Sequence, residues 1–520
     1  MSFPAPATKS AFLFLLALLC FSFRAPAQSH SVHLGAGGKL TYAQTPKGDR
    51  IPDFSCAGYE GGGVALPHVP TKRSVKPSGA DDTDAIQVAI DAVSALPLVD
   101  GFRCAVELAP GSYQCARTLT ITASGVVLRG AGDGDKGTTI SMTGAPHLAL
   151  RIEGHLDQKE TGAPIAITDA YIPAGATTIH LADAASLHPG DTLLIRKPVT
   201  PAWVHFMGMD DLHRNGRDEH WVSARYLDVR RRIAAIHSNA VTLDVPLMDS
   251  YDSRFFEGGH ATVTAITLTS QLAHVGIEDL RFIAPRQTIA LGAPEFSGMQ
   301  VRDVADSWVR SVTWEDTTNG VSVNAGSERI TFLECSIVQR VAVTSAAKPA
   351  DFAIDGSQIL IDRCTASGDN TFYIVTQDRE QGPVVVLHCR FLGNGHIEPH
   401  QRWFTGLLVD NCEVPDGGID FMNRGEMGSG HGWAIGWAVA WNSTAKEFGM
   451  NTPPGSMIWS IGNRGDEINP VFPVFDGGPP RAQLEPATIE SAGKPVKPAS
   501  LYLAQLRDRR GPAAVKAIGY

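Results

Sequence analysis

The chain has 520 residues, and its 44 Lys and Arg residues against 54 Asp and Glu residues give a formal charge of −10. Apolar residues make up 43% of the chain and charged residues 19%, together with 52 glycines and 33 prolines. This composition excludes disorder, a collagen-like fibre and a coiled coil, and the many turn residues favour a β architecture. The acidic balance also excludes a general nucleic-acid binder, which would need a basic face.

The N-terminus has the three-part form of a secretory signal. An apolar run covers residues 11–23 after Lys9, and a small-residue cleavage site ends at Ala27. We therefore expect residues 1–27 to be removed as a signal peptide. This run is too short to span a membrane comfortably, and no later segment is apolar for long enough. The mature protein, which begins with a leader over residues 28–70, is expected to be secreted or periplasmic and to have no membrane span.

Residues 71–159 are predicted to start the main domain with a capping helix. Thr83 can cap this helix at its N-terminus. Apolar residues at helical spacing would then form a buried stripe. The stripe consists of Ile86, Val88, Ala89, Ile90 and Val93. We expect the helix to cover the open N-terminal end of the sheet and to shield its edge strands.

Three cysteines near this start are candidates for a disulfide. Cys104 and Cys115 lie in neighbouring predicted strands, and Cys56 is a competing partner. An exported protein folds in an oxidising compartment, where such bonds persist. The sequence leaves the pairing open.

Residues 160–255 are predicted to form a small β insertion, because hairpin-like segments with turn residues replace the later repeat. A polar and aromatic loop from Trp203 to Trp221 is expected either to overhang a cleft or to pack on the wall of the main domain. The basic run Arg230-Arg-Arg232 is interpreted as a solvated face of the insertion, with contact to an anionic chain as the alternative.

Segments between residues 275 and 444 repeat one pattern, with apolar side chains at offsets 0, 2, 5 and 7. Two short strands joined by a bend would give this pattern, since a bend resets which side chains point inward. The repeats begin at residues 275, 307, 330, 359, 384, 407 and 437. The third apolar position is a cysteine in four of them, namely Cys335, Cys364, Cys389 and Cys412.

A mean period of about 27 residues indicates a β-solenoid, with its main coils over residues 256–470. The four cysteines are then expected to stack in the core as small apolar side chains. In the last repeat Trp437 is expected to point inward, and Asn442 takes the cysteine position, which predicts an internal asparagine stack. Residues 471–520 form a proline-rich tail followed by a short amphipathic helix. Its apolar residues are Leu501, Leu503, Ala504 and Leu506.

Three segments, Ser78–Val93, Val106–Tyr113 and Gly125–Gly132, are similar to the opening of right-handed parallel β-helices of the pectate-lyase superfamily. The resemblance covers roughly residues 70–145 and 262–465. It implies an all-β fold, a right-handed parallel β-helix with a small β insertion, an N-terminal capping helix and a C-terminal tail helix. The resemblance concerns the fold rather than the reaction.

Polar residues after the cysteine-bearing strands are expected to converge on one wall of the solenoid, because neighbouring strands lie about 4.8 Å apart. We predict His400, Arg402, Arg424 and His431 as catalytic residues. The predicted substrate-binding residues are Tyr373, Gln377, Arg379, His396, Trp403, Asp420, Glu426 and Trp433. Trp403 and Trp433 occupy matching repeat positions, and they would either stack on sugars or pack in the interior.

The predicted cluster suits cleavage of a uronic-acid-containing polysaccharide by β-elimination. A cation must neutralise the carboxylate to acidify the C5 proton, and a base must remove that proton. Arg402 or Arg424 can bind a carboxylate with two parallel hydrogen bonds. Neutral His400 can serve as the base, with His431 as its partner or as the acid.

Two other functions remain as alternatives. The segment Gly428–Gly436 resembles the Gly-His-Gly segment of polygalacturonase-type glycoside hydrolases, although the paired aspartates and the Arg-Ile-Lys segment of that family are not evident here. Asp416, Asp420 and Glu426 are the carboxylates that a hydrolase could use instead. A non-catalytic solenoid for glycan binding or adhesion is the third possibility.

The expected partner is an acidic polysaccharide or oligosaccharide, bound by a monomer. Lyases that use calcium gather several aspartates in their groove, and no clear set is visible in this sequence. The sequence therefore leaves Ca²⁺ open without predicting it, and it predicts no other metal or cofactor.

Overall fold

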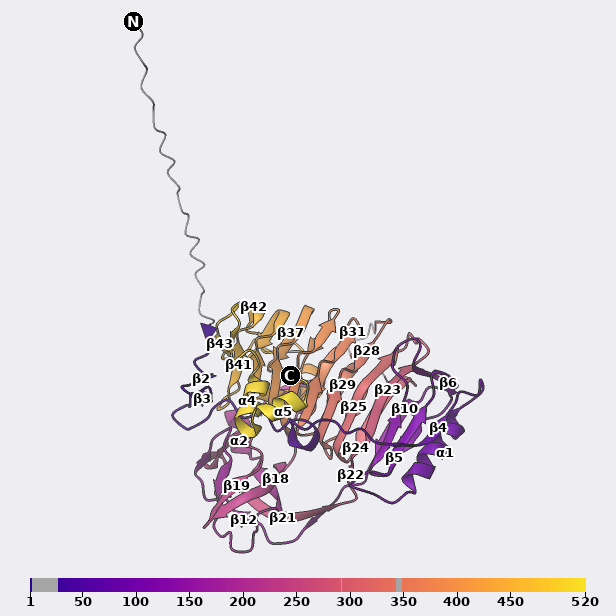
Figure 1. Ribbon diagram of the computed structural model, residues 1–520. Helices are drawn as coiled ribbons and strands as arrows, with labels where there is room; N and C mark the ends of the chain where they lie inside the picture. The colour runs from indigo at the N-terminus through magenta and orange to yellow at the C-terminus, as the bar shows by residue number, and fades with distance from the viewer. Residues whose placement is uncertain (2–26, 291, 343–347) are drawn as a thin grey trace.

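The computed structural model of the protein is a right-handed parallel β-helix (Figure 1). It describes residue 1 and residues 27–290, 292–342 and 348–520, so the predicted signal peptide lies almost entirely outside the described residues. A single sheet of 29 strands winds along the molecule, and its strand pairs are parallel. No helix among the described residues combines the length and the apolar character needed to cross a membrane. The predicted fold class is confirmed.

Three columns of stacked strands form the coils. The first column contains β4 (Thr71–Val75), β5 (Cys104–Leu108), β8 (Val126–Arg129), β23 (Gly276–Ile283), β25 (Val304–Glu315), β27 (Glu328–Leu333), β30 (Ile359–Asp362), β33 (Gln381–Leu387), β36 (Phe404–Asp410), β39 (Ala438–Trp441), β41 (Ile458–Ile461) and β43 (Thr488–Glu490). The second contains β6 (Gly111–Cys115), β9 (Thr138–Met142), β28 (Ser336–Val338), β31 (Thr365–Ser367), β34 (Arg390–Leu392), β37 (Glu413–Phe421), β40 (Thr444–Met450) and β42 (Arg464–Ile468). The third contains β7 (Leu119–Ile121), β10 (Leu148–Glu153), β24 (Ser297–Arg302), β26 (Val321–Val323), β29 (Ala350–Ile354), β32 (Phe372–Thr376) and β35 (His396–Ile397), and it continues into the ends of β37 and β40.

The predicted cysteine stack lies in the core, where all four thiols are buried. The backbone N–H of Cys364 donates to Cys389 Sγ at 3.3 Å. The next position is taken by Ser443, whose Oγ accepts from the N–H of Cys412 at 3.1 Å. Asn463 follows, because its Oδ1 accepts from the N–H of Ser443 at 2.8 Å. Sulfur therefore gives way to oxygen towards the C-terminal end of the stack.

The prediction for Trp437 and Asn442 was wrong by one residue. Leu408 pairs with Val439, so the last repeat begins one position later than expected. The Asn442 amide turns out of the core and donates to the carbonyls of Val496 and Ala499. Trp437 lies under the terminal segments, in a cluster separate from the solenoid core.

Helix α1 (Thr83–Ser94) covers the N-terminal end of the solenoid, as predicted (Figure 1). Its buried residues are Thr83, Ile86, Ala89, Ile90 and Val93, whereas Val88 is 66% exposed and lies outside the apolar stripe. Thr83 does not cap the helix. It is the first helical residue, and its hydroxyl donates to Asp81 Oδ1 at 2.5 Å.

The insertion folds as a separate antiparallel sheet of seven strands beside the solenoid (Figure 1). Its strands are β11 (Asp157–Glu160), β12 (Ile165–Ala166), β14 (Thr178–His180), β15 (Thr192–Pro198), β18 (Tyr226–His237), β19 (Ala240–Leu243) and β21 (Thr262–Thr269). Two small ladders accompany it, β13 (Tyr171–Ile172) with β20 (Tyr251–Asp252), and β16 (Leu212–Arg214) with β17 (Arg217–Glu219). The insertion has its own hydrophobic core, which explains why the solenoid rhythm disappears from this part of the sequence.

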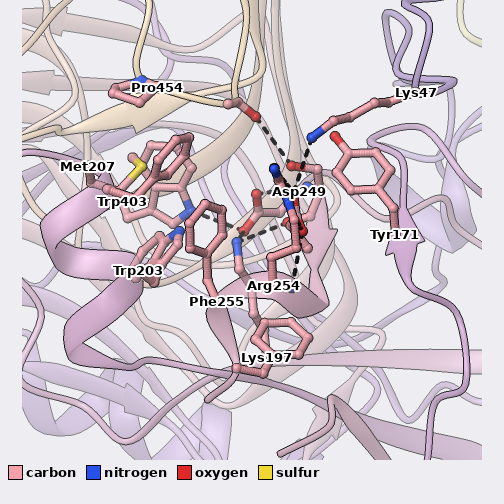
Figure 2. A pocket seen from close by; sticks show the side chains of 15 residues that line it. Lys47, Tyr171, Lys197, Trp203, Met207, Asp249, Arg254, Phe255, Trp403 and Pro454 are labelled. Atoms are coloured by element: carbon pink, nitrogen blue, oxygen red, sulfur yellow. Dashed lines mark hydrogen bonds and ion pairs between the residues drawn. The ribbon is translucent and has the colours of Figure 1, made fainter. Parts of the chain in front are cut away.

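A buried carboxylate connects the insertion to the solenoid (Figure 2). Asp249, which is 1% exposed, accepts hydrogen bonds from Trp403 Nε1 at 3.0 Å and from Trp437 Nε1 at 3.2 Å. The ammonium of Lys197 in β15 donates to the same carboxylate at 2.7 Å and lies 4.8 Å from the ring centroid of Trp203. The two buried charges neutralise each other, and two solenoid tryptophans are held against the insertion.

The leader from Val32 onwards and the C-terminal helices pack on the solenoid (Figure 1). The predicted tail helix is α4 (Leu501–Arg510), which Ser500 caps and α5 (Pro512–Ala517) follows. Buried Asp410 of β36 accepts from Ser500 Oγ at 2.7 Å and from the N–H of Tyr502 at 2.8 Å, which docks the helix. In the leader, β2 (Val32–Leu34) pairs with β3 (Leu40–Tyr42), and β1 (Ala27–Gln28) pairs with β44 (Val496–Lys497).

None of the candidate disulfides among Cys56, Cys104 and Cys115 is present, and all seven cysteines of the described residues are free thiols. Cys104 begins β5 and Cys115 ends β6, so the bend between the two strands separates them. Cys56 packs instead against Val245 and Met248.

Thiol titration checks this correction. In the native protein we expect only Cys104 to react with a thiol reagent, because the other six described thiols are buried. In denaturant all seven should react. A shortfall of two thiols in denaturant without reductant would reveal a disulfide and contradict the structure.

Replacing Asp249 should weaken the docking of the insertion. Asp249→Ala leaves the Lys197 ammonium buried without its counter-charge, so the free energy of unfolding should fall by about 3–5 kcal/mol. The control is Arg254→Ala, because Arg254 is exposed and pairs with Asp252 at the surface; this change should cost at most about 1 kcal/mol. Urea unfolding would measure both variants, and equal midpoints would argue against the proposed role of Asp249.

Candidate functional site

Two histidines contact each other beyond the third column of strands. His400 follows β35 and His431 follows the short helical turn α3 (Met427–Gly430). Their ring centroids are 4.6 Å apart, and the ring planes are nearly perpendicular at 82°. His400 Nδ1 lies 3.3 Å from Gln377 Oε1, whereas His431 Nδ1 is buried and has no hydrogen-bond partner among the described residues.

Two arginines flank this histidine pair. Arg402 Nη2 donates to the carbonyl and the hydroxyl of Ser429, at 2.7 and 2.8 Å, and its Nε has no partner in the described part of the chain. Arg424 is more constrained, because Nε lies 3.0 Å from Glu398 Oε1 and Nη1 donates to the carbonyl of His400 at 2.9 Å. Among the described residues Arg424 thus pairs with a carboxylate and Arg402 does not, so Arg402 is the guanidinium whose charge is uncompensated.

Both imidazoles of the pair are held in the neutral form. Burial, with the positive charges of Arg424 and Arg402, lowers the pKa of His400 to about 4. Burial, Arg424, the neighbouring His400 and Arg402 lower the pKa of His431 to about 3. A neutral imidazole has one unprotonated ring nitrogen, so each ring can accept a proton near neutral pH.

A group of acidic residues lies next to the histidine pair on the same wall. His396 Nδ1 is 2.6 Å from Asp420 Oδ2, and one donor atom each of His396, Asp420 and Glu447 lie within 4.8 Å of one another. Burial by itself would lower the pKa of His396. The hydrogen bond to Asp420 and the negative charge of Asp420 together have a larger effect, so the pKa of His396 lies above its ordinary value. Burial also raises the pKa of Glu398, although Arg424 opposes this effect.

His396, Asp420 and Glu447 have donor atoms of the kind that binds a divalent transition-metal ion. The short hydrogen bond between His396 and Asp420 already occupies two of those atoms. Calcium, which prefers an all-oxygen set of six to eight ligands, does not fit this trio.

The predicted sugar-stacking surface does not form. Trp403 and Trp433 are 3% and 2% exposed, and they pack against Trp203 and Trp221 of the insertion. Trp433 Nε1 donates to the carbonyl of Met207 at 3.0 Å. The aromatic loop of the insertion therefore packs on the solenoid wall, and these tryptophans hold it there.

Two further predicted binding residues are also structural. Tyr373 is fully buried and its ring stacks on Phe391 at 5.1 Å between centroids. Glu426 is 4% exposed, and its carboxylate accepts from the N–H of Phe475 at 2.7 Å and faces Arg481 at 3.9 Å. Tyr373 lies within β32, where a register shift between Phe372 and Ile374 interrupts the alternation and all five residues are buried, whereas Glu426 lies in the turn before α3.

The structure thus brings His400, His431, Arg402, Arg424 and Gln377 into one cluster. His396 and Asp420 form a second cluster beside it. Arg424 lies between the two clusters, because it pairs with Glu398. The exposed side chain of Arg379 points to neither cluster and pairs with Asp378 at 2.7 Å, although its backbone N–H donates to the carbonyl of Arg402 at 3.0 Å.

The site predicted from sequence lacked Glu447. Glu447 pairs with Gly418 in the neighbouring coil, across a register shift that follows Val414. Such an irregularity hides the position from any repeat alignment, and only the outward alternation of β40 could have indicated it.

No protein-family model matches the sequence, and no curated protein matches it. Among solved structures, a polygalacturonase from Erwinia carotovora is 12% identical over 84% of this chain and 96% of its own, with a TM-score of 0.36. A tailspike protein of Escherichia coli bacteriophage HK620, solved with a pentasaccharide, is 9% identical over 80% of this chain and 63% of its own, with a TM-score of 0.37. The tailspike of Pseudomonas phage LKA1 is 15% identical over 74% of this chain and 69% of its own, with a TM-score of 0.33. The resemblance to the pectate-lyase superfamily stays a prediction, and no activity transfers from proteins this distant.

The charge states of the histidines are open to direct measurement. His400 and His431 should remain neutral down to about pH 5, because their pKa values are near 4 and 3. His396 should stay protonated above its ordinary pKa, because it faces Asp420. Nitrogen NMR of the imidazoles over a pH series would test this, with His400→Gln and His431→Gln to assign the signals. A titration of either His400 or His431 near pH 6.5 would contradict the electrostatics of the cluster.

Proposed function

We propose that the protein is an exported lyase that cleaves a uronic-acid-containing polysaccharide by β-elimination. The observation that supports this best is the contact between His400 and His431, which are neutral and flanked by two guanidiniums. Proton abstraction next to a carboxylate needs a neutral base and a cation that neutralises the acid group. Export is proposed on the N-terminal sequence alone.

The contacts suggest separate roles for the two arginines. Arg402 donates to Ser429 but has no carboxylate partner in the described part of the chain, so it would bind the uronate carboxylate. Arg424 is committed to Glu398 and to the His400 carbonyl, so it would position His400 and add positive charge. Binding of the substrate carboxylate would offset that positive charge and raise the proton affinity of His400 when the base is needed.

In the proposed step, His400 takes the proton from C5 and the electron pair forms the double bond between C4 and C5. The bond from C4 to the glycosidic oxygen breaks, and the leaving oxygen takes a proton from solvent, because His431 is neutral and has no acidic proton to give. No water is consumed, so cleavage produces an unsaturated sugar at the new end.

A glycoside hydrolase is the second candidate, because two carboxyl groups follow each other on neighbouring coils. Glu398 has a raised pKa, which suits a general acid. Asp420 accepts from His396 and from the N–H of Gly449, which fixes its carboxylate in place as the second carboxyl group. Of the other two predicted carboxylates, Glu426 is committed to the tail and Asp416 is exposed on β37, so neither is proposed again.

A screen of acidic and neutral polysaccharides separates these functions. Ultraviolet absorbance of an unsaturated product together with new reducing ends would establish the lyase. Reducing ends alone would establish the hydrolase, and binding without either product would leave a glycan-binding solenoid.

His400→Ala and Arg402→Ala should each lower kcat/KM by roughly 100-fold or more, since each removes a group that acts in proton transfer or charge neutralisation. The melting temperature should fall by only a few degrees, because both side chains are partly exposed. The matched control is Arg390→Ala, because Arg390 is exposed on β34 in the second column and its ion pair with Glu413 contributes little, so the activity should be unchanged. Full activity in either site variant, or unfolding of that variant, would remove the residue from the proposed mechanism.

A further inference from the structure

Three side chains that are able to ligate a metal meet on the outer wall of the third column of strands. His396 lies in β35, Asp420 in β37 and Glu447 in β40, on three successive coils. One donor atom of each residue lies within 4.8 Å of those of the other two. The proposed elimination uses none of these three side chains, so their convergence calls for a separate explanation.

A glycine in the middle coil allows side chains from the outer two coils to meet. Gly418 pairs in register with His396 on one side and with Glu447 on the other. Strands of neighbouring coils lie about 4.8 Å apart, so the backbones of His396 and Glu447 are separated by roughly twice that distance. A Cβ atom at position 418 would lie only 2.6 Å from His396 Nδ1. The imidazole therefore crosses over Gly418 towards Glu447, through space that a side chain at position 418 would fill.

A second glycine makes room for Asp420. Gly449 pairs with Asp420 on the next coil, and its N–H donates to Asp420 Oδ1 at 3.2 Å. A Cβ atom at position 449 would lie 2.5 Å from that oxygen. The backbone thus holds Oδ1, while Oδ2 lies 2.6 Å from His396 Nδ1. Two glycines in one wall keep the space around the three side chains open.

The group has more negative than positive charge. Neither Asp420 nor Glu447 has a lysine or arginine within ion-pair distance among the described residues. Asp466, exposed on the following coil, is in register with Glu447 and adds a third carboxylate. A protonated His396 offsets one of the three charges. Like charges held this close repel each other, and a bound cation removes the repulsion.

Two cations of the same wall leave this balance in place. Arg424 pairs with another carboxylate, that of Glu398, at 3.0 Å. Lys348 acts on both His396 and Glu398, but it lies outside ion-pair distance of each. The described chain therefore supplies no direct counter-ion for Asp420 and Glu447 other than the imidazole.

The geometry accommodates zinc with small movements. Zinc binds imidazole nitrogen and carboxylate oxygen at about 2.0–2.2 Å, so two tetrahedral ligands lie roughly 3.3 Å apart. His396 Nδ1 and Asp420 Oδ2 are 2.6 Å apart, so they would separate by about 0.7 Å as the ion replaces the proton between them. Glu447 has no hydrogen-bond or ion-pair partner in the part of the chain that the structure describes, so no contact must break when it turns towards the ion.

We propose that His396, Asp420 and Glu447 bind a divalent transition-metal ion of the zinc class. Three protein ligands leave an open coordination position for water. The imidazole nitrogen disfavours calcium and magnesium, which bind oxygen ligands. This site stands on the three side chains and the two glycines, and it does not depend on the proposed reaction.

Calorimetric titration of the chelator-treated protein, prepared without a histidine tag, tests the site. The wild type should bind one equivalent of Zn²⁺, it should bind Mn²⁺ more weakly, and Ca²⁺ should not displace Zn²⁺. His396→Gln and Glu447→Gln should each weaken zinc binding by at least about 10-fold, because loss of a group that merely orients a metal ligand already costs about 10–100-fold. Both side chains are partly exposed, so the melting temperatures should fall by only a few degrees.

His180→Gln is the matched control. His180 Nδ1 lies 2.8 Å from Asp169 Oδ1 on the insertion, and in the described ranges no third ligand joins this pair. Its zinc affinity should stay within about 2-fold of the wild type, because two ligands do not form a zinc site. X-ray absorption at the zinc edge should show an imidazole nitrogen among ligands at about 2.0–2.2 Å.

Four results would overturn the proposal. They are no stoichiometric zinc binding by the wild type, wild-type affinity in both site variants, an equal loss in His180→Gln, or a zinc spectrum without an imidazole. His400→Ala should bind zinc as the wild type does while it loses cleavage, so failure of the proposed reaction is separable from failure of the metal site.

Discussion

Hydrogen bonding between successive coils is the interaction on which the rest of the structure depends. It fixes neighbouring strands about 4.8 Å apart, so residues from distant parts of the sequence stand side by side. His396 faces Asp420 for this reason, and Arg424 reaches Glu398 in the coil before it. The same spacing crowds positive charges around His400, which is why its pKa departs so far from the ordinary value. The chemistry of the wall follows from the geometry of the stack.

Much of this fold was predictable because each coil has apolar residues at the same positions of the repeat. The cysteine stack and both terminal helices are where alternation and helical periodicity place them. The prediction failed at Asn442 because the coils differ in length, and one extra residue changes which side chain points inward. The candidate disulfide between Cys104 and Cys115 does not form for a related reason. The number of residues between two cysteines does not reveal the bend that separates their strands.

Less of the candidate site was predictable. Aligning the coils brings His400 near Arg424, since both follow strands of one column. Which of these side chains are exposed to solvent could not be predicted from the sequence. Trp403 and Trp433 have the composition of a sugar platform, yet they are covered by the insertion, which no periodicity encodes.

The insertion also changes how the solenoid behaves as a whole. A stack of coils interacts only with its nearest neighbours, so it can fray from either end and begin folding anywhere. Here the chain leaves the stack after β10, returns at β22 (Leu272–Ala273), and rests on Trp403 and Trp437 much farther along. The insertion therefore connects the coils before it with coils much later in the sequence. Unfolding of either group of coils removes packing contacts of the insertion, so the two groups are expected to unfold together. During synthesis the insertion cannot contact Trp403 and Trp437 until these later residues have been made. Contacts between residues so far apart in the sequence make folding slow.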